Sequence, residues 1–111
     1  MSRKATQKWR VPPGFEAAFA QLQTIPNVGP ATAEDLVRLG IRSVGGLKQQ
    51  NPLALYERIC RLDGVRHDPC VIDVFMSAVA FARTGSRRTW WSYTPERKRL
   101  LARISRAKPR R

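Results

Sequence analysis

The chain has 111 residues, a formal net charge of +13 and 42% hydrophobic residues. This size fits one compact domain, and the longest apolar stretch, from Cys70 to Ala82, is shorter than the ~20 residues of a membrane span. The first residues lead into no apolar segment, so we expect no secretory signal and no membrane partner. Two cysteines do not make a disulfide framework, which favours a reducing, cytoplasmic location.

The charge is concentrated at the two ends of the chain. Residues 11–85 contain seven basic and seven acidic residues, whereas residues 1–10 contain four basic residues and no acid. Residues 86–111 contain ten basic residues and one acid. The sequence therefore predicts a basic flexible arm (1–10), a neutral domain (11–85) and a basic aromatic tail (86–111).

Residues 15–39 predict two helices joined by a tight turn. Apolar side chains first recur at three- and four-residue spacing, and this helix should continue to the residue before Pro26. Asn27 and Gly29 are residue types that tolerate the left-handed backbone of a tight turn. The second helix should start at Pro30 and stop at a glycine. This is the sequence pattern of a helix-hairpin-helix.

Start and stop signals divide the rest of the domain. Ser43 is expected to cap a single helical turn, and residues 51–63 to form a helix that begins at an Asn-Pro pair and ends before a glycine. Residues 69–83 should form the central buried helix, capped by Asp68, because they are apolar around most of the helix circumference. No stretch alternates as a strand does. The fold class predicted is all-α, a compact bundle of about five helices with basic N- and C-terminal extensions.

The tail contains one further pattern. Thr94-Pro95-Glu96 is a helix-start signal, and Leu100, Leu101 and Ile104 share one face of a helix that would run from about residue 95. Basic residues occupy most of the remaining circumference. Such a segment either docks on the domain or becomes ordered only on a polyanion.

Three blocks within residues 25–81 resemble known proteins: IPNVGPATAEDLVRLGIRSV, NPLALYERICRLDGVRHDPC and VIDVFMSAVAFA. They resemble a family of small bacterial proteins, the pathogenicity-locus helix-hairpin-helix proteins, and DGVRHDPCVIDVF is the most specific part. The first block is also similar, more loosely, to the C-terminal domain of bacterial competence regulators. The resemblance implies an all-helical fold and DNA binding, and it implies no established activity.

The hairpin is the first candidate site. We expect its turn, with Asn27, to present the backbone N–H groups of Val28, Gly29, Ala31 and Thr32 to a nucleic-acid phosphate at a helix N-terminus. In DNA-repair proteins the position of Asn27 is usually Gly and that of Ala31 is often Lys, so one phosphate-facing charge is missing. The alternative is a hairpin that only connects two packed helices.

The tail is the second candidate site. Its basic side chains would neutralise phosphates and its tryptophans would stack on unpaired bases; these residues are Arg87, Arg88, Trp90, Trp91, Arg97, Lys98, Arg99 and Arg103. The alternatives are a solvated tail without a partner and aromatic rings that cover an edge of the core, and we expect at least one tryptophan to pack in this way.

Cys60, His67 and Cys70 are the chain's only histidine and cysteines. Their spacing matches no common zinc site, so we expect no metal and no cofactor, and we interpret both cysteines as small buried side chains. Catalysis by Cys70 with His67 is the lesser alternative, because a helix N-terminus lowers the pKa of a thiol.

The sequence contains no catalytic constellation, since it lacks a Gly-rich phosphate loop with Lys, paired carboxylates in a plausible cleft and an acidic cluster for two metals. We therefore expect no enzyme, but a protein that binds nucleic acid, DNA first of all, through its backbone phosphates and without sequence specificity. The alternative from another class is a protein-interaction adaptor whose basic tail has no specific nucleic-acid role.

Overall fold

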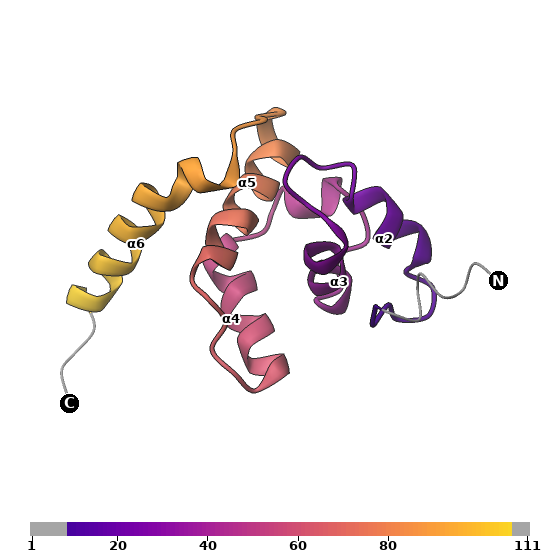
Figure 1. Cartoon of the computed structure of the whole chain (residues 1–111), viewed down its shortest axis with the longest axis horizontal. Helices are drawn as coiled ribbons and strands as arrows, with labels where there is room; N and C mark the ends of the chain where they lie inside the picture. The colour runs from indigo at the N-terminus through magenta and orange to yellow at the C-terminus, as the bar shows by residue number, and fades with distance from the viewer. Residues whose placement is uncertain (1–8, 108–111) are drawn as a thin grey trace.

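The computed structural model describes residues 9–107 (Figure 1). Within this range the elements are α2 (Glu16–Leu22), α3 (Pro30–Arg38), the 3-10 turn η1 (Gly45–Leu47), α4 (Pro52–Asp63), α5 (Cys70–Thr84), the 3-10 turn η2 (Trp90–Tyr93) and α6 (Thr94–Ala107). The prediction of an all-α bundle of about five helices is confirmed, and these residues include no strand. Residues 1–8, most of the predicted basic arm, lie outside the described part of the chain.

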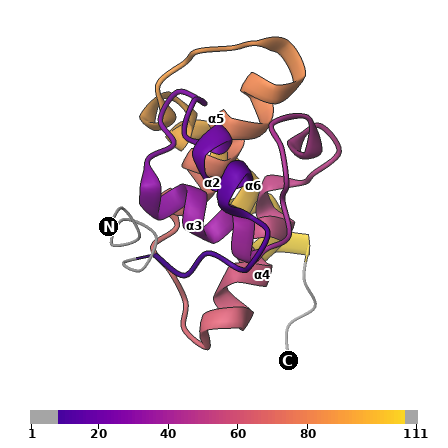
Figure 2. The same cartoon turned by 90° about the vertical axis from the view of Figure 1, so that its right-hand side faces the viewer.

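Helix α5 is the central element, as its apolar circumference predicts. Ile72, Phe75 and Ala78 are completely buried, and α4, η1, η2 and α6 pack against this helix. Figure 1 shows α4 and α6 beside α5, with α2 and α3 on the side away from α6; Figure 2 views the bundle from the side of α2 and α3. One apolar core extends through α2, α3, α4 and α5. No helix in the described range is long and apolar enough to cross a membrane.

The local start and stop signals act as predicted. The side chains of Ser43, Asn51 and Asp68 each accept hydrogen bonds from backbone N–H groups two or three residues later. Gly40 and Gly64 have left-handed φ angles of 90° and 69° just after α3 and α4. A residue without a Cβ adopts this conformation at little cost, so both glycines end their helices.

The first helix is shorter than predicted. It ends at Leu22 rather than at Ile25, and the N–H groups of residues 23–25 each bond the carbonyl three residues back, in tighter turns. The physical reason is Pro26, whose ring would clash with the Leu22 carbonyl of a continuing helix and which disfavours a helical backbone at Ile25. Ile25 is nevertheless buried in the core, which explains why its spacing resembled that of a helical residue.

A buried ion pair helps to dock the basic tail on the domain. Arg97 of α6 donates from Nε to Asp73 of α5 at 2.9 Å and from Nη2 at 3.4 Å, and the Thr94 hydroxyl donates to the same carboxylate at 2.6 Å. Asp73 is 0% exposed and Arg97 is 9% exposed. Leu101 also packs against the edge of the core, and the far end of α6 then diverges from α5 (Figure 1). Of the two alternatives for the tail, docking is therefore the observed one.

Candidate nucleic-acid interface

The turn between α2 and α3 (residues 23–29) takes its shape from Asn27. Asn27 has a φ of 75°, the left-handed conformation that its residue type predicts. Gly29 has an extended backbone instead, with φ −99° and ψ −169°, so of these two residue types only Asn27 uses its tolerance of the left-handed region. A Cβ at Gly29 would meet no atom within 4 Å. The space in front of Gly29 is therefore open to a ligand.

Three of the four predicted phosphate-facing amides remain available. The N–H of Val28 donates to the carbonyl of Ile25 at 3.1 Å, so the prediction that it faces a phosphate is wrong. The N–H groups of Gly29, Ala31 and Thr32 have no acceptor within residues 9–107, and Gly29 and Ala31 are exposed. These groups lie at the N-terminus of α3, where unpaired donors and the helix dipole favour an anion.

Asn27 also joins this turn to the basic tail. Its Nδ2 donates a hydrogen bond of 2.9 Å to the backbone carbonyl of Arg88, 61 residues further along the chain. The turn and the tail, which the sequence suggested as two separate candidate sites, therefore meet at one point. The backbone of Arg88 thus lies next to the turn, whose Ala31 stands where related hairpins often have Lys.

The side chain of Arg88 is held within the tail. Its guanidinium lies 3.9 Å from the centre of the Tyr93 ring and donates to the hydroxyl and the carbonyl of Ser92 at 3.1 and 3.0 Å. Glu96 lies 3.5 Å from the same guanidinium. Both Arg88 and the neighbouring Arg87 are exposed, so the positive charge of this segment faces solvent.

The aromatic residues of η2 divide between core and surface. Tyr93 is buried, and Trp90 is half-buried. Trp91 is 60% exposed and meets Trp90 edge-on, with ring centroids 5.7 Å apart. Of the two tryptophans assigned to nucleic acid, Trp91 is therefore the ring with the larger free face.

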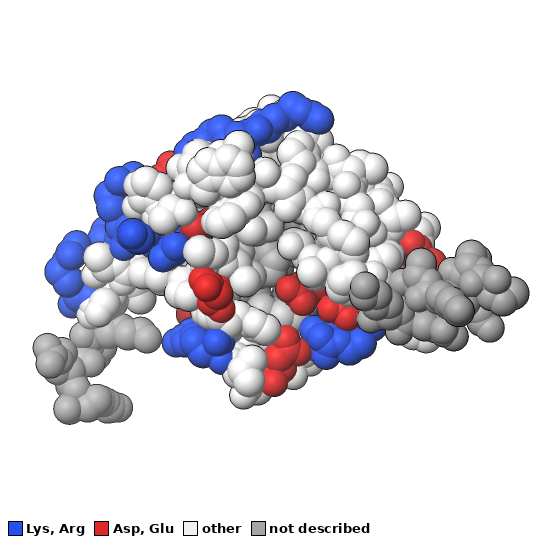
Figure 3. Space-filling view, viewed as in Figure 1, with Lys and Arg blue, Asp and Glu red and all other residues white. Residues whose placement is uncertain are grey.

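The basic residues of α6 also divide. Arg97 is buried in its ion pair with Asp73 and does not face solvent. Lys98, Arg99 and Arg103 are exposed. Figure 3 shows Lys and Arg side chains along the upper and left edge of the molecule, over the segment after α5 and over α6. Acidic side chains in this view gather lower down, around the end of α4. The basic surface is thus contributed mainly by the tail.

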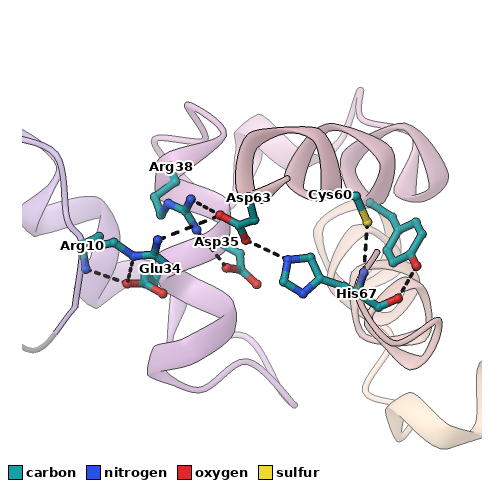
Figure 4. A network of polar contacts seen from close by, with 8 residues as sticks. Arg10, Glu34, Asp35, Arg38, Cys60, Asp63 and His67 are labelled. Carbon is teal, nitrogen blue, oxygen red and sulfur yellow. Dashed lines mark hydrogen bonds and ion pairs between the residues drawn. The ribbon is translucent and has the colours of Figure 1, made fainter. Parts of the chain in front are cut away.

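A separate cluster of charges is closed upon itself (Figure 4). It combines three carboxylates from α3 and α4 with three cationic or imidazole side chains, and its members are Glu34, Asp35, Asp63, Arg10, Arg38 and His67. The Arg10 backbone donates to Glu34 at 2.6 Å, Arg38 binds Asp63, and His67 Nε2 lies 2.7 Å from Asp63. These pairs fix the chain before α2 and the end of α4 to α3.

The carboxylates of this cluster have different acidities. Burial and the nearby Glu34 charge raise the pKa of Asp35 to about 6. The hydrogen bond from Arg38 is the main reason that the pKa of Asp63 lies below its usual value. Burial would raise the pKa of Glu34, but the bonds from Arg10 outweigh it and hold the pKa low. Glu34 and Asp63 are thus ion-pair partners, and Asp35 is the carboxylate with the weakest support.

The His67 ring makes no hydrogen bond to Cys60 or Cys70 among the described residues. The backbone N–H of His67 donates to Cys60 Sγ at 3.4 Å, and its ring is engaged by Asp63. The Asp68 carboxylate and burial raise the pKa of the Cys70 thiol, so the prediction that the helix N-terminus lowers it is wrong. Among the described residues, no three His, Cys, Asp or Glu side chains are grouped so as to hold a metal ion.

Comparison with known proteins adds a family and a relative. The model of a family described as "Pathogenicity locus" matches residues 16–99. A mitomycin resistance protein, McrB of Streptomyces lavendulae, is 47% identical over 83 residues, which cover 75% of this chain and 79% of that protein. No solved structure matches the chain. The residues matched by the family include the turn between α2 and α3, as well as Asp73 and Arg97.

Proposed function

The chain belongs to the pathogenicity-locus family, and we propose that it binds nucleic acid, with DNA as the first candidate, without sequence specificity. In this proposal α2 and α3 act as a helix-hairpin-helix that holds one backbone phosphate. The tail supplies most of the electrostatic attraction. The observation that carries the proposal is the bond from Asn27 to the Arg88 carbonyl, which joins the turn with three available amides to the basic tail.

The turn contributes position rather than sequence reading. The N–H groups of Gly29, Ala31 and Thr32 are suited to bind a phosphate, and a phosphate is the same whichever base it is attached to. The Arg88 backbone carbonyl, bonded by Asn27, brings the start of the basic tail next to this turn, so a phosphate backbone held there would continue onto the tail. This division of work explains why a hairpin without the usual Lys is compatible with nucleic-acid binding.

The tail contributes charge and one aromatic ring. The side chains of Lys98, Arg99 and Arg103 on α6 are exposed, so a phosphate backbone can reach them. Each phosphate that they neutralise releases counterions, so the affinity should fall steeply with salt. Trp91 adds a stacking surface for an unpaired base.

Substitution of Gly29 tests the proposal. Gly29→Ala and Gly29→Glu should both fold, because the site is open, the backbone is extended, and an acid near a helix N-terminus is tolerated. The glutamate places a negative charge over the amides. We expect Gly29→Glu to weaken binding of a labelled DNA duplex about tenfold in fluorescence anisotropy at moderate salt, an effect of about 1.4 kcal/mol, and Gly29→Ala to change it little.

Two results would oppose the proposal. A folded Gly29→Glu variant that binds the duplex as tightly as the original chain would show that the turn is no phosphate site. A chain that binds neither duplex nor single-stranded DNA at moderate salt would leave the adaptor as the better explanation of the fold.

A further inference from the structure

A groove that is open to solvent lies between helices α5 and α6. The groove has a volume of about 620 Å³. Its aliphatic lining comes from Met76, Val79 and Ala80 of α5 and from Leu100 of α6. A surface of this kind, open to solvent and lined by aliphatic side chains that include a flexible methionine, is adaptable to an apolar ligand.

The same groove is strongly positive. Arg83, Arg99 and Arg103 line it, against one acid, Glu96, which lies 3.5 Å from the Arg88 guanidinium. Arg83 is fixed in place because it donates to the carbonyls of two residues before α4, at 2.8 and 3.3 Å. Arg99 and Arg103 are exposed and have no carboxylate partner among the described residues. The groove therefore combines an apolar floor with uncompensated positive charge.

We propose that this groove binds an amphipathic helix of a partner protein, with apolar residues on one face and acidic residues beside them. The chain's own ends do not fit the charge, because residues 1–8 and 108–111 contain basic residues and no acid. A second copy does not fit it either, since each copy has a formal net charge of +13. The occupant must bring negative charge together with apolar side chains, which is the character of an acidic amphipathic helix.

The lining favours such a helix over a nucleic-acid strand. Bases bind without sequence preference mainly by stacking on exposed aromatic rings. The one aromatic ring of this groove, Tyr93, is 6% exposed and is covered by Arg88. The Thr84 hydroxyl already donates to the Ala80 carbonyl at 3.0 Å. Leucine or isoleucine side chains would fill the aliphatic floor, and acidic side chains would pair with Arg99 and Arg103.

Replacing each of two alanines by phenylalanine tests the groove without changing the charge. Ala80→Phe fills the floor, and Ala102→Phe makes the same exchange at an exposed position of α6 outside the groove. The probe is a labelled synthetic helix with leucines at positions i, i+3, i+4 and i+7 and glutamates elsewhere. Its control is a scrambled peptide of identical composition. We expect the helical peptide to bind about tenfold tighter than the scrambled one, and only Ala80→Phe to remove this difference.

Arg103→Glu and Arg106→Glu provide a second pair, in case Ala80→Phe lowers the melting temperature. Both change the charge equally on one helix, but only Arg103 lines the groove. Arg103→Glu should lower the affinity for the helical peptide about tenfold more than Arg106→Glu does. Equal binding of the helical and scrambled peptides, or equal losses in the two variants, would overturn the inference.

Although both use basic residues of α6, peptide binding in the groove and duplex binding at the turn can be tested separately. Ala80→Phe leaves the charge and the turn at Gly29 unchanged, so duplex binding should remain as it is. Ala80→Phe could instead weaken the binding of a single-stranded oligonucleotide while the helical peptide binds as before. The groove would then be part of the nucleic-acid site, and this result would exclude the partner helix.

Discussion

The side-chain amide of Asn27 donates a hydrogen bond to the backbone carbonyl of Arg88, which fixes the basic tail against the turn between α2 and α3. Asn27 makes this bond from a left-handed backbone with φ 75°. Glycine, usual at this position in DNA-repair hairpins, would allow the same backbone but has no side chain to bind the tail. The asparagine thus combines a turn residue with a link between two parts of the candidate interface.

Two substitutions of Asn27 separate these roles. Asn27→Gly keeps the left-handed backbone and loses the bond, whereas Asn27→Ala loses the bond and also places a Cβ in this conformation. We expect Asn27→Ala to lower the free energy of unfolding by about 2 kcal/mol and Asn27→Gly by about 1 kcal/mol or less, measured by urea denaturation. Equal losses would show that the backbone conformation at residue 27 has no energetic weight.

Arg97→Ala tests the docking of α6. It leaves the Asp73 carboxylate buried without its cation, and we expect a loss of about 3 kcal/mol in the free energy of unfolding. Lys98→Ala, at the exposed neighbouring position, should cost less than about 0.5 kcal/mol. Limited proteolysis should release α6 from the Arg97→Ala variant first. Similar stability and cleavage of the two variants would contradict a structural role for the pair.

Neutralising the outer face of α6 tests the tail without removing it. Deletion of residues 86–111 would also uncover Asp73, so we prefer the triple variant Lys98→Gln, Arg99→Gln and Arg103→Gln. If each residue contacts one phosphate of a duplex, the slope of log affinity against log salt should become shallower by about 2.7. A triple variant at positions outside the tail, Arg42→Gln, Lys48→Gln and Arg61→Gln, has the same charge. Equal slopes for the two triple variants would refute tail binding.

Asp35 predicts a pH dependence of stability. Its pKa is about 6 in the folded protein against an ordinary 3.8, so the folded state favours the neutral carboxyl. Ionisation therefore costs stability, with no penalty below about pH 4 and the full penalty above about pH 6. The neighbouring charges of Glu34 and Asp63 add to this penalty, and those of Arg38 and His67 oppose it.

Asp35→Asn should remove the penalty. Because the side chain is partly exposed, we expect a gain of about 1 kcal/mol in the free energy of unfolding at pH 7.5 and no gain at pH 4. Urea denaturation of both proteins at the two pH values measures the difference. A gain that is the same at both pH values would mean that ionisation of Asp35 is not its cause.

The elements of the fold were predictable where the signals are local. The caps at Ser43, Asn51 and Asp68 bond amides two or three residues away, so neighbouring residues suffice to identify them. The end of α2 was missed because Ile25 is buried beyond the helix at a helical spacing. Periodicity reports which residues face the core, and it does not report the backbone that brings them there.

The partners of buried charges were not predictable in the same way. Asp73 interrupts an apolar helix, and this alone indicates a polar partner, because an unpaired buried carboxylate is costly. Nothing near it in the sequence identifies Arg97, 24 residues later, whose place in the basic tail suggested a contact with nucleic acid instead. Likewise, the sequence does not show which amides of the turn are available, because the bond from the Val28 N–H to the Ile25 carbonyl depends on the folded shape of the turn.

Apart from the end of α2, the sequence by itself determined the helices, the basic ends and the turn chemistry of Asn27, because these depend on residue type and short spacing. Only the tertiary structure decided which amides and arginines stay open and that the turn and the tail share one surface. The Asn27–Arg88 bond and the Asp73–Arg97 pair join residues 61 and 24 positions apart. Such contacts exist only once the core has packed the helices together, so no local pattern encodes them.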